Sequence, residues 1–326
     1  MIFITDYIKN FEIEEEILGS NFSSYKEEQL DKSKIKVLLV WHAEINEITL
    51  QDFPKLHSIV RYGVGVDNID IDFCRKNRIE VFNNPDYGVD EVSDTTIAMI
   101  LALGRNIGKY NNKAKELIKA PNIENPWQEN TDFSSIRFKE ISLGLIGVGR
   151  IGSSVALKMK NIVRNLNFYD PYVPLGYEKV LGANRFNSLE KLLENSQIIS
   201  FHVPLNEETK GMINRSFINK MQDNSILINT SRGGIIDSLD CLYSGLSSGK
   251  LSSLGLDVLP QEPPSLSKKE ELLTSWIAEN NELSDKIIIN PHTSYYSPES
   301  YKEMREKAAT MALNCLHKKQ VDNKIV

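Results

Sequence analysis

The chain has 326 residues, of which 41% are hydrophobic and 25% are charged, and its formal net charge is −6. Roughly two domains are expected from this length, and the mild acidity gives no electrostatic reason to expect a nucleic acid or an anionic membrane as partner. The apolar runs are shorter than a membrane span, the first residues lack a signal-peptide pattern, and the three cysteines (Cys74, Cys241 and Cys315) have neither disulfide-framework nor zinc-site spacing. We therefore expect a reduced, cytoplasmic protein without a metal.

The first part of the chain alternates between strand-like and helix-like segments. Strands are expected at Ile2–Thr5, Lys36–Trp41, Ser58–Arg61 and Ile79–Phe82. Helices are expected at Phe11–Leu18 and Ile69–Asn77, and then one long helix over Val89–Gly108, followed by a proline-containing loop or arm at Ala120–Trp127. A helix that is apolar nearly all round must be buried, so we expect the long helix to lie at an interface between domains or subunits.

The second part is more regular. Continuous Val/Ile/Leu runs, typical of strands covered on both faces, occur at Ser142–Ile146, Leu166–Tyr169, Ile198–Phe201, Ile226–Asn229, Ser253–Leu256 and Ile287–Ile289. A charged connection with room for a helix at Lys268–Ile277 precedes the last of these strands, and a helix is expected at Pro298–His317. The alternation predicts an α/β protein with parallel sheets.

Three glycines stand between a predicted strand and a predicted helix in a G-x-G-x-x-G motif. Gly147 allows the tight turn, Gly149 lets the backbone approach a pyrophosphate, and Gly152 lets the helix and strand pack closely. The helix that starts after Gly149 offers N–H groups to the phosphates. Because an acidic residue, Asp170, ends the next predicted strand, the context favours a dinucleotide site.

Asp170 also indicates which dinucleotide binds. Its carboxylate would accept hydrogen bonds from the adenosine ribose, whereas a 2′-phosphate there would face a negative charge. No basic residue follows at Pro171, Tyr172 or Val173. The sequence therefore predicts NAD(H) rather than NADP(H).

Polar or permissive residues follow nearly every predicted strand of the second part. They are Gly147, Asp170, His202–Pro204, Thr230–Arg232, Asp257 and Pro291–His292. Ligands of open parallel sheets lie outside the carboxyl ends of the strands. An acid–base histidine and a cationic clamp beside a dinucleotide are the groups that hydride transfer requires.

At this point the chain resembles a known family. The matching segments are RYGVGVDNID at 61–70, NPDYG at 84–88, GVGRIG at 147–152, FYDPY at 168–172, HVPL at 202–205, NTSRGG at 229–234, GLDVLPQEP at 255–263 and NPHT at 290–293. In order and spacing they resemble the D-isomer-specific 2-hydroxyacid dehydrogenase family, and within it the branch of bacterial relatives of the C-terminal-binding-protein corepressors and of phosphoglycerate dehydrogenase-like members. The resemblance runs from about Ile59 to Met304.

The resemblance implies an NAD-dependent enzyme that transfers a hydride between the nicotinamide and C2 of a D-2-hydroxy or 2-oxo acid. Its catalytic trio falls on Arg232, Glu262 and His292. His292 would take the hydroxyl proton as the hydride leaves, and Glu262 would hydrogen-bond and orient the imidazole. Arg232 would hold the substrate carboxylate and polarise the keto oxygen.

The remaining site residues follow from the motifs and from the resemblance together. Cofactor-binding residues are expected at Gly147, Gly149, Arg150, Ile151, Gly152, Asp170, His202, Pro204, Thr230 and Asp257. Asp257 would contact the nicotinamide carboxamide, and His202 would be a wall of the site rather than a base. Backbone at Val64 and Gly65 would close on the substrate carboxylate.

The substrate itself stays open at this point. Glu262 argues against formate dehydrogenase chemistry, where the resemblance would place Gln. Arg61 either binds a second acidic group, such as a phosphate, on the substrate or pairs with a nearby carboxylate such as Asp67, and we weigh the two equally. The rival functions are an NAD(H)-sensing, corepressor-like binding protein and a scaffold with little turnover.

Two α/β domains are expected, both with parallel sheets. The substrate domain, flavodoxin-like by the resemblance, would comprise residues 1–103 and 298–326, and a Rossmann-like NAD domain, residues 104–297, would be inserted into it. Two chain crossings would form a hinge, so that closure on the substrate expels water. The long helix and its arm suggest a homodimer, as in the family.

Overall fold

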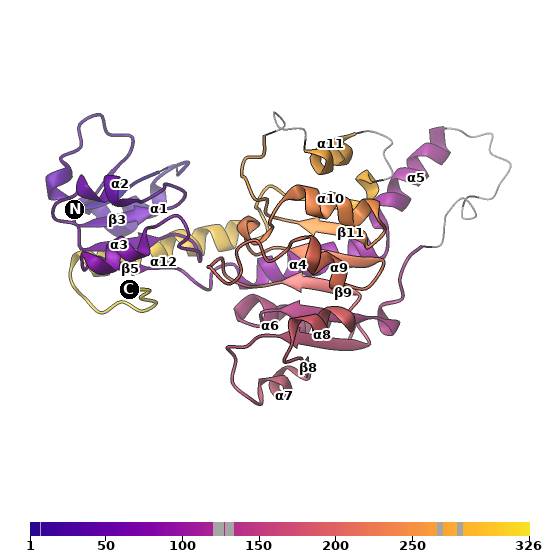
Figure 1. Cartoon of the computed structure of the whole chain (residues 1–326). Coiled ribbons are helices and arrows are strands. Elements are labelled where there is room, and N and C mark those ends of the chain that lie inside the picture. The colour runs from indigo at the N-terminus through magenta and orange to yellow at the C-terminus, as the bar shows by residue number, and fades with distance from the viewer. Residues whose placement is uncertain (7, 120–126, 128–133, 266–269, 279–282) are drawn as a thin grey trace. The chain divides into compact units, whose positions relative to one another are not determined.

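The structure, a computed structural model, describes residues 1–6, 8–119, 127, 134–265, 270–278 and 283–326. They form two compact units (Figure 1). Unit 1 comprises Met1–Gly88 and Tyr296–Val326, and unit 2 comprises Val89–Tyr295. In both units helices cover a parallel sheet, so the predicted fold class is confirmed.

Unit 1 is built on a parallel sheet with the strand order β2-β1-β3-β4-β5. Its strands are β1 (Ile2–Ile4), β2 (Phe22–Ser24), β3 (Val37–Val40), β4 (Ser58–Arg61) and β5 (Glu80–Phe82), and its helices are α1 (Glu12–Leu18), α2 (Glu47–Gln51), α3 (Ile71–Lys76) and α12 (Pro298–Leu316). Although α12 is last in sequence, it contacts α1, β3 and β4 (Figure 1). This strand order is the flavodoxin-like one.

A buried ion pair fastens α12 to α1. Arg305 donates from Nε to Oε1 of Glu14 (3.0 Å) and from Nη2 to the other carboxylate oxygen, and the exposed fractions of the two residues are 4% and 0%. Tyr62, which directly follows β4, donates its hydroxyl to Glu14 Oε1 (3.0 Å). Nη2 of Arg305 also donates to the carbonyl of Asn10 (2.6 Å). Because each charge has hydrogen-bonding partners, the pair can stay inside the unit.

Unit 2 is built on a parallel sheet with the strand order β12-β11-β10-β9-β6-β7-β8. Its strands are β6 (Ser142–Ile146), β7 (Asn165–Tyr169), β8 (Asn184–Arg185), β9 (Ile198–Phe201), β10 (Ser225–Asn229), β11 (Leu251–Leu256) and β12 (Ile287–Ile289). Its helices are α4 (Val89–Gly104), α5 (Ile107–Lys119), α6 (Arg150–Met159), α7 (Tyr177–Leu181), α8 (Leu189–Glu194), α9 (Arg215–Lys220), α10 (Leu239–Ser247) and α11 (Glu271–Ile277). The order reverses at β6, as in a Rossmann sheet.

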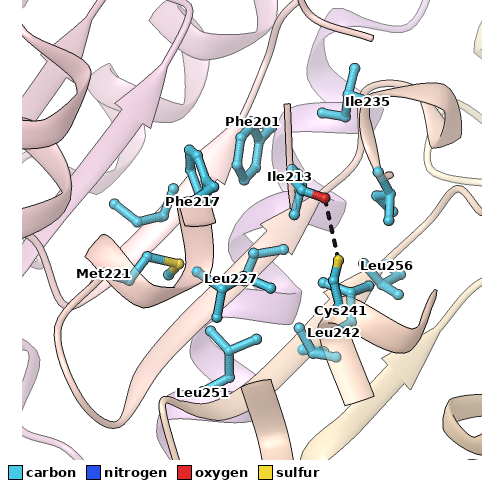
Figure 2. Close-up of a cluster of buried hydrophobic side chains, with 14 of the residues drawn as sticks. Phe201, Ile213, Phe217, Met221, Leu227, Ile235, Cys241, Leu242, Leu251 and Leu256 are labelled. Carbon is cyan, nitrogen blue, oxygen red and sulfur yellow. Dashed lines mark hydrogen bonds between the residues drawn. The ribbon is translucent and has the colours of Figure 1, made fainter. Parts of the chain in front are cut away.

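The larger core cluster of unit 2 lies between the sheet and helices α9 and α10 (Figure 2). Phe201 and Phe217 meet with ring centroids 5.4 Å apart. The thiol of Cys241 donates to the carbonyl of Ile213 (3.3 Å), so this cysteine is a packed core residue. Apolar side chains on the strands therefore stabilise the packing of the helices on the sheet. The polar residues at the strand ends do not belong to this core and are available to form a site.

The predicted strands all occur, with ends that differ by at most a few residues. Among the described residues, two strands were not predicted, β2 and β8. Both lie at sheet edges and carry polar residues (Ser-Ser in β2, Asn-Arg in β8), so they lack the apolar run on which strand prediction depends. The helix expected at Lys268–Ile277 is α11 within the described residues, and most of the expected arm at Ala120–Trp127 lies outside them.

The long helix expected over Val89–Gly108 is wrong in its length. It ends at Gly104, Asn106 has a φ of +53°, and α5 begins at Ile107. The returning chain packs at this point, because Ile136 donates its N–H to the carbonyl of Gly104 (2.9 Å) and a Cβ on Gly104 would lie 2.6 Å from the ring of Phe138. The close approach needs a glycine, and the chain turns directly after it.

The expected domain boundaries, after Leu103 and after Ser297, also differ from those of the structure. The units divide after Gly88 and after Tyr295, so α4 belongs wholly to unit 2. Met99, Ile100 and Leu103 on α4 are buried in a core cluster of that unit, and the helix contacts α6, β10 and β11. The apolar face that predicted an interface is thus largely used within unit 2.

Candidate active site

The glycine loop lies between β6 and α6. Gly147 has a φ of +86°, and a Cβ there would lie 2.5 Å from the carbonyl oxygen of His202. A Cβ on Gly152 would lie 2.2 Å from the carbonyl oxygen of Gly147, whereas a Cβ on Gly149 would meet no atom within 4 Å. The two outer glycines therefore pack the loop against the protein, and the middle one leaves open space, as a backbone that must approach a pyrophosphate requires. Arg150 begins α6 directly after this opening.

Asp170 lies at the end of β7, beside this loop. Its carboxylate accepts hydrogen bonds from the backbone N–H groups of Val148 and Tyr172 (both 2.9 Å). Arg185 on β8, which was not predicted to lie near this turn, donates to the carbonyls of Asp170 (3.1 Å) and Val173 (2.8 Å). The guanidinium thus supports the backbone of the turn, while the carboxylate is held against the glycine loop by the N–H of Val148.

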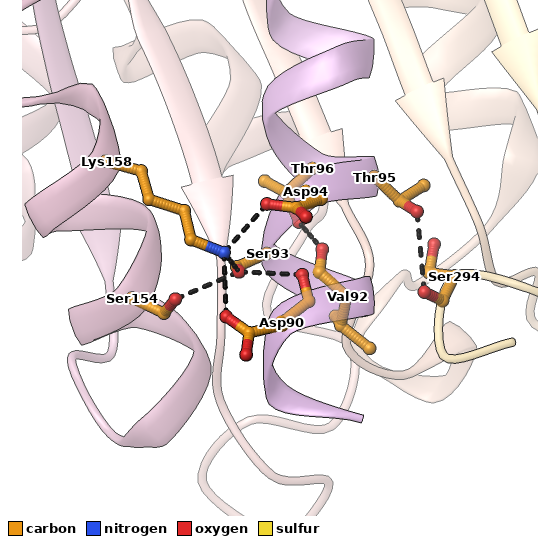
Figure 3. Close-up of polar contacts among 9 residues, drawn as sticks. All are labelled: Asp90, Val92, Ser93, Asp94, Thr95, Thr96, Ser154, Lys158 and Ser294. Atoms are coloured by element: carbon orange, nitrogen blue, oxygen red, sulfur yellow. Dashed lines mark hydrogen bonds and ion pairs between the residues drawn. The ribbon is translucent and has the colours of Figure 1, made fainter. Parts of the chain in front are cut away.

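A charged cluster joins α6 to α4 (Figure 3). Nζ of Lys158 lies 3.0 Å from a carboxylate oxygen of Asp90, 2.7 Å from one of Asp94 and 2.8 Å from the hydroxyl of Ser93. Burial alone would lower the pKa of Lys158, but hydrogen bonds to Asp94 and Asp90 outweigh it and raise the pKa. The cluster therefore holds α6, the helix that begins directly after Gly149, against α4.

His202 follows β9, behind the glycine loop. Burial lowers its pKa to about 3, so the ring is neutral at physiological pH, and its Nε2 lies 3.0 Å from the hydroxyl of Ser200. An imidazole that takes up a proton so reluctantly is unsuited to general base catalysis near neutral pH. Pro204, two residues on, is exposed, and its carbonyl accepts a hydrogen bond from Thr209 (2.6 Å).

Asn229, the last residue of β10, shapes the next loop. It is fully buried, its Oδ1 accepts hydrogen bonds from the N–H of Ser231 (3.0 Å) and the hydroxyl of Ser231 (2.8 Å), and its Nδ2 donates to the carbonyl of Arg232 (3.0 Å). Thr230, between them, has its hydroxyl 2.8 Å from that of Thr96 on α4. The amide therefore fixes the backbone from which the half-buried Arg232 extends.

Gly233 brings the Arg232 loop against the loop that carries Glu262. A Cβ on Gly233 would lie 1.8 Å from the carbonyl oxygen of Leu259, and the N–H of Leu259 donates to Oε1 of Glu262 (2.8 Å). No side chain larger than hydrogen fits at this point without a backbone shift. Two loops that follow different strands are thereby held in register.

Glu262 and His292 form the central pair of the site. Nδ1 of His292 lies 2.7 Å from Oε2 of Glu262. Burial alone would raise the pKa of Glu262, but the hydrogen bonds from His292 and from the N–H of Leu259, with the nearby charge of Arg232, lower it. The residue therefore stays an anion, and because it binds Nδ1, Nε2 is the nitrogen of His292 left to meet a substrate.

Asp257, after β11, holds the backbone that presents His292. One carboxylate oxygen accepts the N–H groups of Thr293 (2.9 Å) and Ser294 (3.0 Å), and the carbonyl of Asp257 accepts the N–H of His292 (2.9 Å). His292 has a φ of +55°. Burial raises the pKa of Asp257, against the effect of these N–H donors.

The structure thus brings Arg232, Glu262, His292 and Asp257 together at the carboxyl ends of β10, β11 and β12. Sequence reasoning missed Asn229, Gly233 and Tyr295, whose ring meets that of His292 edge-on at 6.5 Å between centroids. Asn229 and Gly233 lie inside the NTSRGG motif, so the sequence indicated their position near the site. It did not indicate that they hold the loops in place. Within the described residues, no group of three or more His, Cys, Asp or Glu side chains could hold a metal ion.

The remaining predicted residues, Arg61, Val64 and Gly65, lie in unit 1 at the end of β4. Nε of Arg61 donates to Oδ1 of Asn68 (3.1 Å). Asn83 donates from Nδ2 to the carbonyl of Val64 (2.7 Å), and Val64 is exposed. Asn68 and Asn83 therefore fix the loop by hydrogen bonds, and the side chain of Val64 faces solvent.

Comparisons with known proteins bear on the family and the fold of the chain. Residues 97–294 match the family model of the D-isomer specific 2-hydroxyacid dehydrogenase, NAD binding domain. A D-3-phosphoglycerate dehydrogenase of Methanocaldococcus jannaschii is 33% identical over 279 residues, which are 85% of this chain and 49% of that protein. A glyoxylate reductase of Korarchaeum cryptofilum is 32% identical over 256 residues, 78% of this chain and 72% of the relative. The chain thus spans about half the length of the first relative.

A solved structure extends the match to nearly the whole chain. The D-lactate dehydrogenase of Aquifex aeolicus, crystallised with NAD and lactic acid, has a TM-score of 0.83 and 29% sequence identity, covering 98% of this chain and 96% of its own. No helix among the described residues is both long enough and apolar enough to cross a membrane.

Proposed function

The chain belongs to the D-isomer-specific 2-hydroxyacid dehydrogenase family, and from that premise we propose that it interconverts a D-2-hydroxy acid and its 2-oxo acid with NAD as cofactor. The observation that carries the proposal is the Glu262–His292 pair, which lies beside Arg232 at the carboxyl edge of the NAD-domain sheet. NAD supplies the hydride acceptor for oxidation and, reduced, the hydride donor for reduction.

In this mechanism His292 moves the proton. Its Nε2 takes the hydroxyl proton during oxidation and returns it to the oxygen at C2 during reduction. Glu262, held anionic by the N–H of Leu259 and by the imidazole, fixes Nδ1 as the nitrogen that it binds and stabilises the charged ring that forms. The pair thus supplies orientation and charge together.

Arg232 binds the acid in this proposal. A planar guanidinium can contact the carboxylate and the C2 oxygen with separate N–H groups, which places C2 near the hydride. Asn229 and Gly233 keep its backbone in position. In unit 1, we assign exposed backbone at Val64 and Gly65 to the substrate carboxylate, with Arg61 supporting the loop through Asn68.

The proposed cofactor residues fit NAD. The opening at Gly149 and the first turn of α6, with Arg150 and Ile151, would hold the pyrophosphate. Asp170 would bind the ribose and disfavour a 2′-phosphate. His202, Pro204 and Thr230 would line the site, and Asp257 would receive the carboxamide while it holds the backbone after His292.

We also propose a homodimer in the cytoplasm. Within the described residues, α5 buries no side chain, and Ile118 on it is 68% exposed although the helix has an apolar stripe. A second copy of the chain is the partner that would cover it. The three cysteines are free thiols, which suits a reducing compartment.

The test is oxidation of NADH by the purified protein with a panel of 2-oxo acids, beside His292→Ala. We expect turnover with at least one acid and a loss of roughly 10²- to 10⁴-fold in the variant, with NADH binding retained. NADH binding without turnover of any acid would instead support the sensing or scaffold alternative, which the dehydrogenase and reductase relatives disfavour.

A further inference from the structure

The carboxyl edge of the unit 1 sheet is formed by the segments that follow β1, β3 and β4. In a sheet of this strand order, ligands lie at the carboxyl ends near the point where the order reverses, between β1 and β3. Trp41–Ala43 follows β3, and Tyr62–Gly65 follows β4. This edge is therefore where unit 1 can contact a substrate.

At this edge the chain binds its own carboxylate. Asp6 accepts the backbone N–H groups of Trp41 (2.8 Å), His42 and Ala43 (2.9 Å). Successive N–H groups of this kind make an anion site. Because Asp6 occupies it and adds a negative charge, these three N–H groups are unsuited to a phosphate of the substrate.

Aromatic side chains cover the same edge. The ring of Trp41 stacks on that of His42 at 5.1 Å and 20°, and it also packs against Tyr301 at 5.6 Å. Tyr301 in turn meets Tyr296 at 5.7 Å. His42 is exposed and Tyr296 is 56% exposed, so the four rings form a surface, which we call the aromatic wall (Trp41, His42, Tyr296 and Tyr301).

Asn68 fastens the aromatic wall to the loop assigned to the substrate carboxylate. Its Nδ2 donates to the carbonyl of Ala43 (2.8 Å), and its Oδ1 accepts from Nε of Arg61 (3.1 Å), two residues before Gly63. The segments after β3 and β4 are therefore one connected surface. A 2-oxo acid held by the Val64–Gly65 backbone would extend its C3 substituent along it.

We propose that the substrate is a 2-oxo acid with an aromatic side chain, which packs on the aromatic wall; this inference rests on the proposed dehydrogenase function. Offset and edge-on ring contacts favour a planar ring over a chain of the same length. A phosphorylated side chain would meet the carboxylate of Asp6 and, in Trp41, Tyr296 and Tyr301, rings that carry no positive charge. The proposal thus selects the aromatic class over the phosphorylated one that Arg61 had left open.

The test compares kcat/KM for NADH-dependent reduction of glyoxylate, pyruvate, phenylpyruvate and 3-phosphohydroxypyruvate by the full chain. We expect phenylpyruvate to exceed pyruvate by about 10-fold or more, the scale on which apolar pockets discriminate, and to exceed the phosphorylated acid. If glyoxylate or 3-phosphohydroxypyruvate is the best substrate, the dehydrogenase function stands and the aromatic proposal is overturned. If no acid is reduced although NADH binds, the proposed function itself fails.

Variants of Trp41 connect the preference to the wall. Trp41→Ala should reduce the ratio of kcat/KM for phenylpyruvate to that for glyoxylate by roughly 10-fold or more, and Trp41→Phe should keep most of that ratio. Ile48→Ala, at a side chain on α2 that is 78% exposed, is the matched control and should leave the ratio unchanged. Equal ratios in the Trp41→Ala and Ile48→Ala proteins, both shown to be folded by thermal unfolding, would refute the assignment.

Discussion

The two units share a parallel-sheet architecture but use charge in opposite ways. In unit 2, ionisable side chains at the strand ends meet one another across loops, as Glu262 and His292 do. In unit 1, charges are turned inward, because Asp6 binds its own backbone and Glu14 pairs with Arg305 inside the unit. The edge of unit 1 presents backbone and aromatic rings, together with Arg61, whose Nε donates to Asn68. We therefore propose that unit 2 supplies the groups that move the proton and bind the acid, whereas unit 1 recognises the substrate through backbone and aromatic rings.

The largest expected effect compares the two arginines of the proposed site. Arg232→Ala should lower kcat/KM by roughly 10³-fold or more, because in the proposed mechanism it removes a positioned charge that contacts the reacting groups. Arg232→Lys should recover little, since a point charge does not replace a two-pronged donor. Arg61→Ala should cost about 10-fold or less, because its Nε supports a loop through Asn68. Steady-state kinetics on the preferred 2-oxo acid measures all three.

Selectivity gives this comparison a second readout. If Arg61→Ala specifically abolished reduction of phosphorylated 2-oxo acids, Arg61 would bind a charged group of the substrate, and unit 1 would not recognise the substrate through backbone and aromatic rings alone. Unchanged selectivity would remove the phosphate role that the sequence had left open.

Much of the fold could be predicted from the sequence because buried parallel strands are continuous apolar runs. Edge strands such as β8 were not predicted, because they consist of polar residues. The break after α4 escaped as well, since it depends on Ile136 and Phe138 packing against Gly104, a contact between segments separated in sequence. Sequence patterns report local periodicity, whereas the edge strands and the end of α4 depend on contacts with residues far away in the sequence.

The candidate site was predictable to the extent that motifs carry it. The G-x-G-x-x-G loop has the geometry that its spacing implied, and Glu262 and His292 lie in contact. Glu262 alone would have been taken for a solvated turn residue, so only the resemblance identified it. The aromatic wall was not predicted, because its rings come from the segment after β3 and from the last helix and its approach, far apart along the chain.

The buried ion pair of unit 1 gives the largest expected effect on stability. Glu14→Ala should lower the free energy of unfolding by about 3–5 kcal/mol, because the guanidinium of Arg305 would stay buried without its partner. The double variant Glu14→Leu with Arg305→Met should recover most of that loss, since neither charge remains. Chemical denaturation measures both. A double variant as unstable as the single one would mean that the pair does more than neutralise itself.

Substitutions at two glycines of unit 2 should distinguish an effect on packing from an effect on NADH binding. Gly233→Ala should destabilise by about 1–3 kcal/mol and lower activity by roughly 10²-fold, because its Cβ would meet the Leu259 carbonyl at 1.8 Å and displace the Arg232 loop. Gly149→Ala meets no atom within 4 Å, so the free energy of unfolding should hardly change, but NADH affinity should fall as the opening fills. Unfolding and NADH fluorescence titrations give both numbers, and a Gly149→Ala protein with unaltered NADH affinity would place the pyrophosphate elsewhere.

The smallest effect concerns His202 and pH. Burial lowers its pKa to about 3 in the folded chain, whereas the ordinary value is 6.5, so the unfolded chain binds a proton more readily. The contribution of the neutral ring is therefore complete above pH 6.5 and is lost as the pH falls from there towards 3, with a slope of at most about 1.4 kcal/mol per pH unit. His202→Asn should flatten this part of the stability curve between pH 6.5 and 5, relative to the unaltered chain. Since Glu262, whose pKa is lowered, loses its own contribution only below the usual carboxyl range, it leaves that window unaffected. An equal slope in both proteins would show that the ring is protonated in the folded state, which would return His202 to the list of candidate bases.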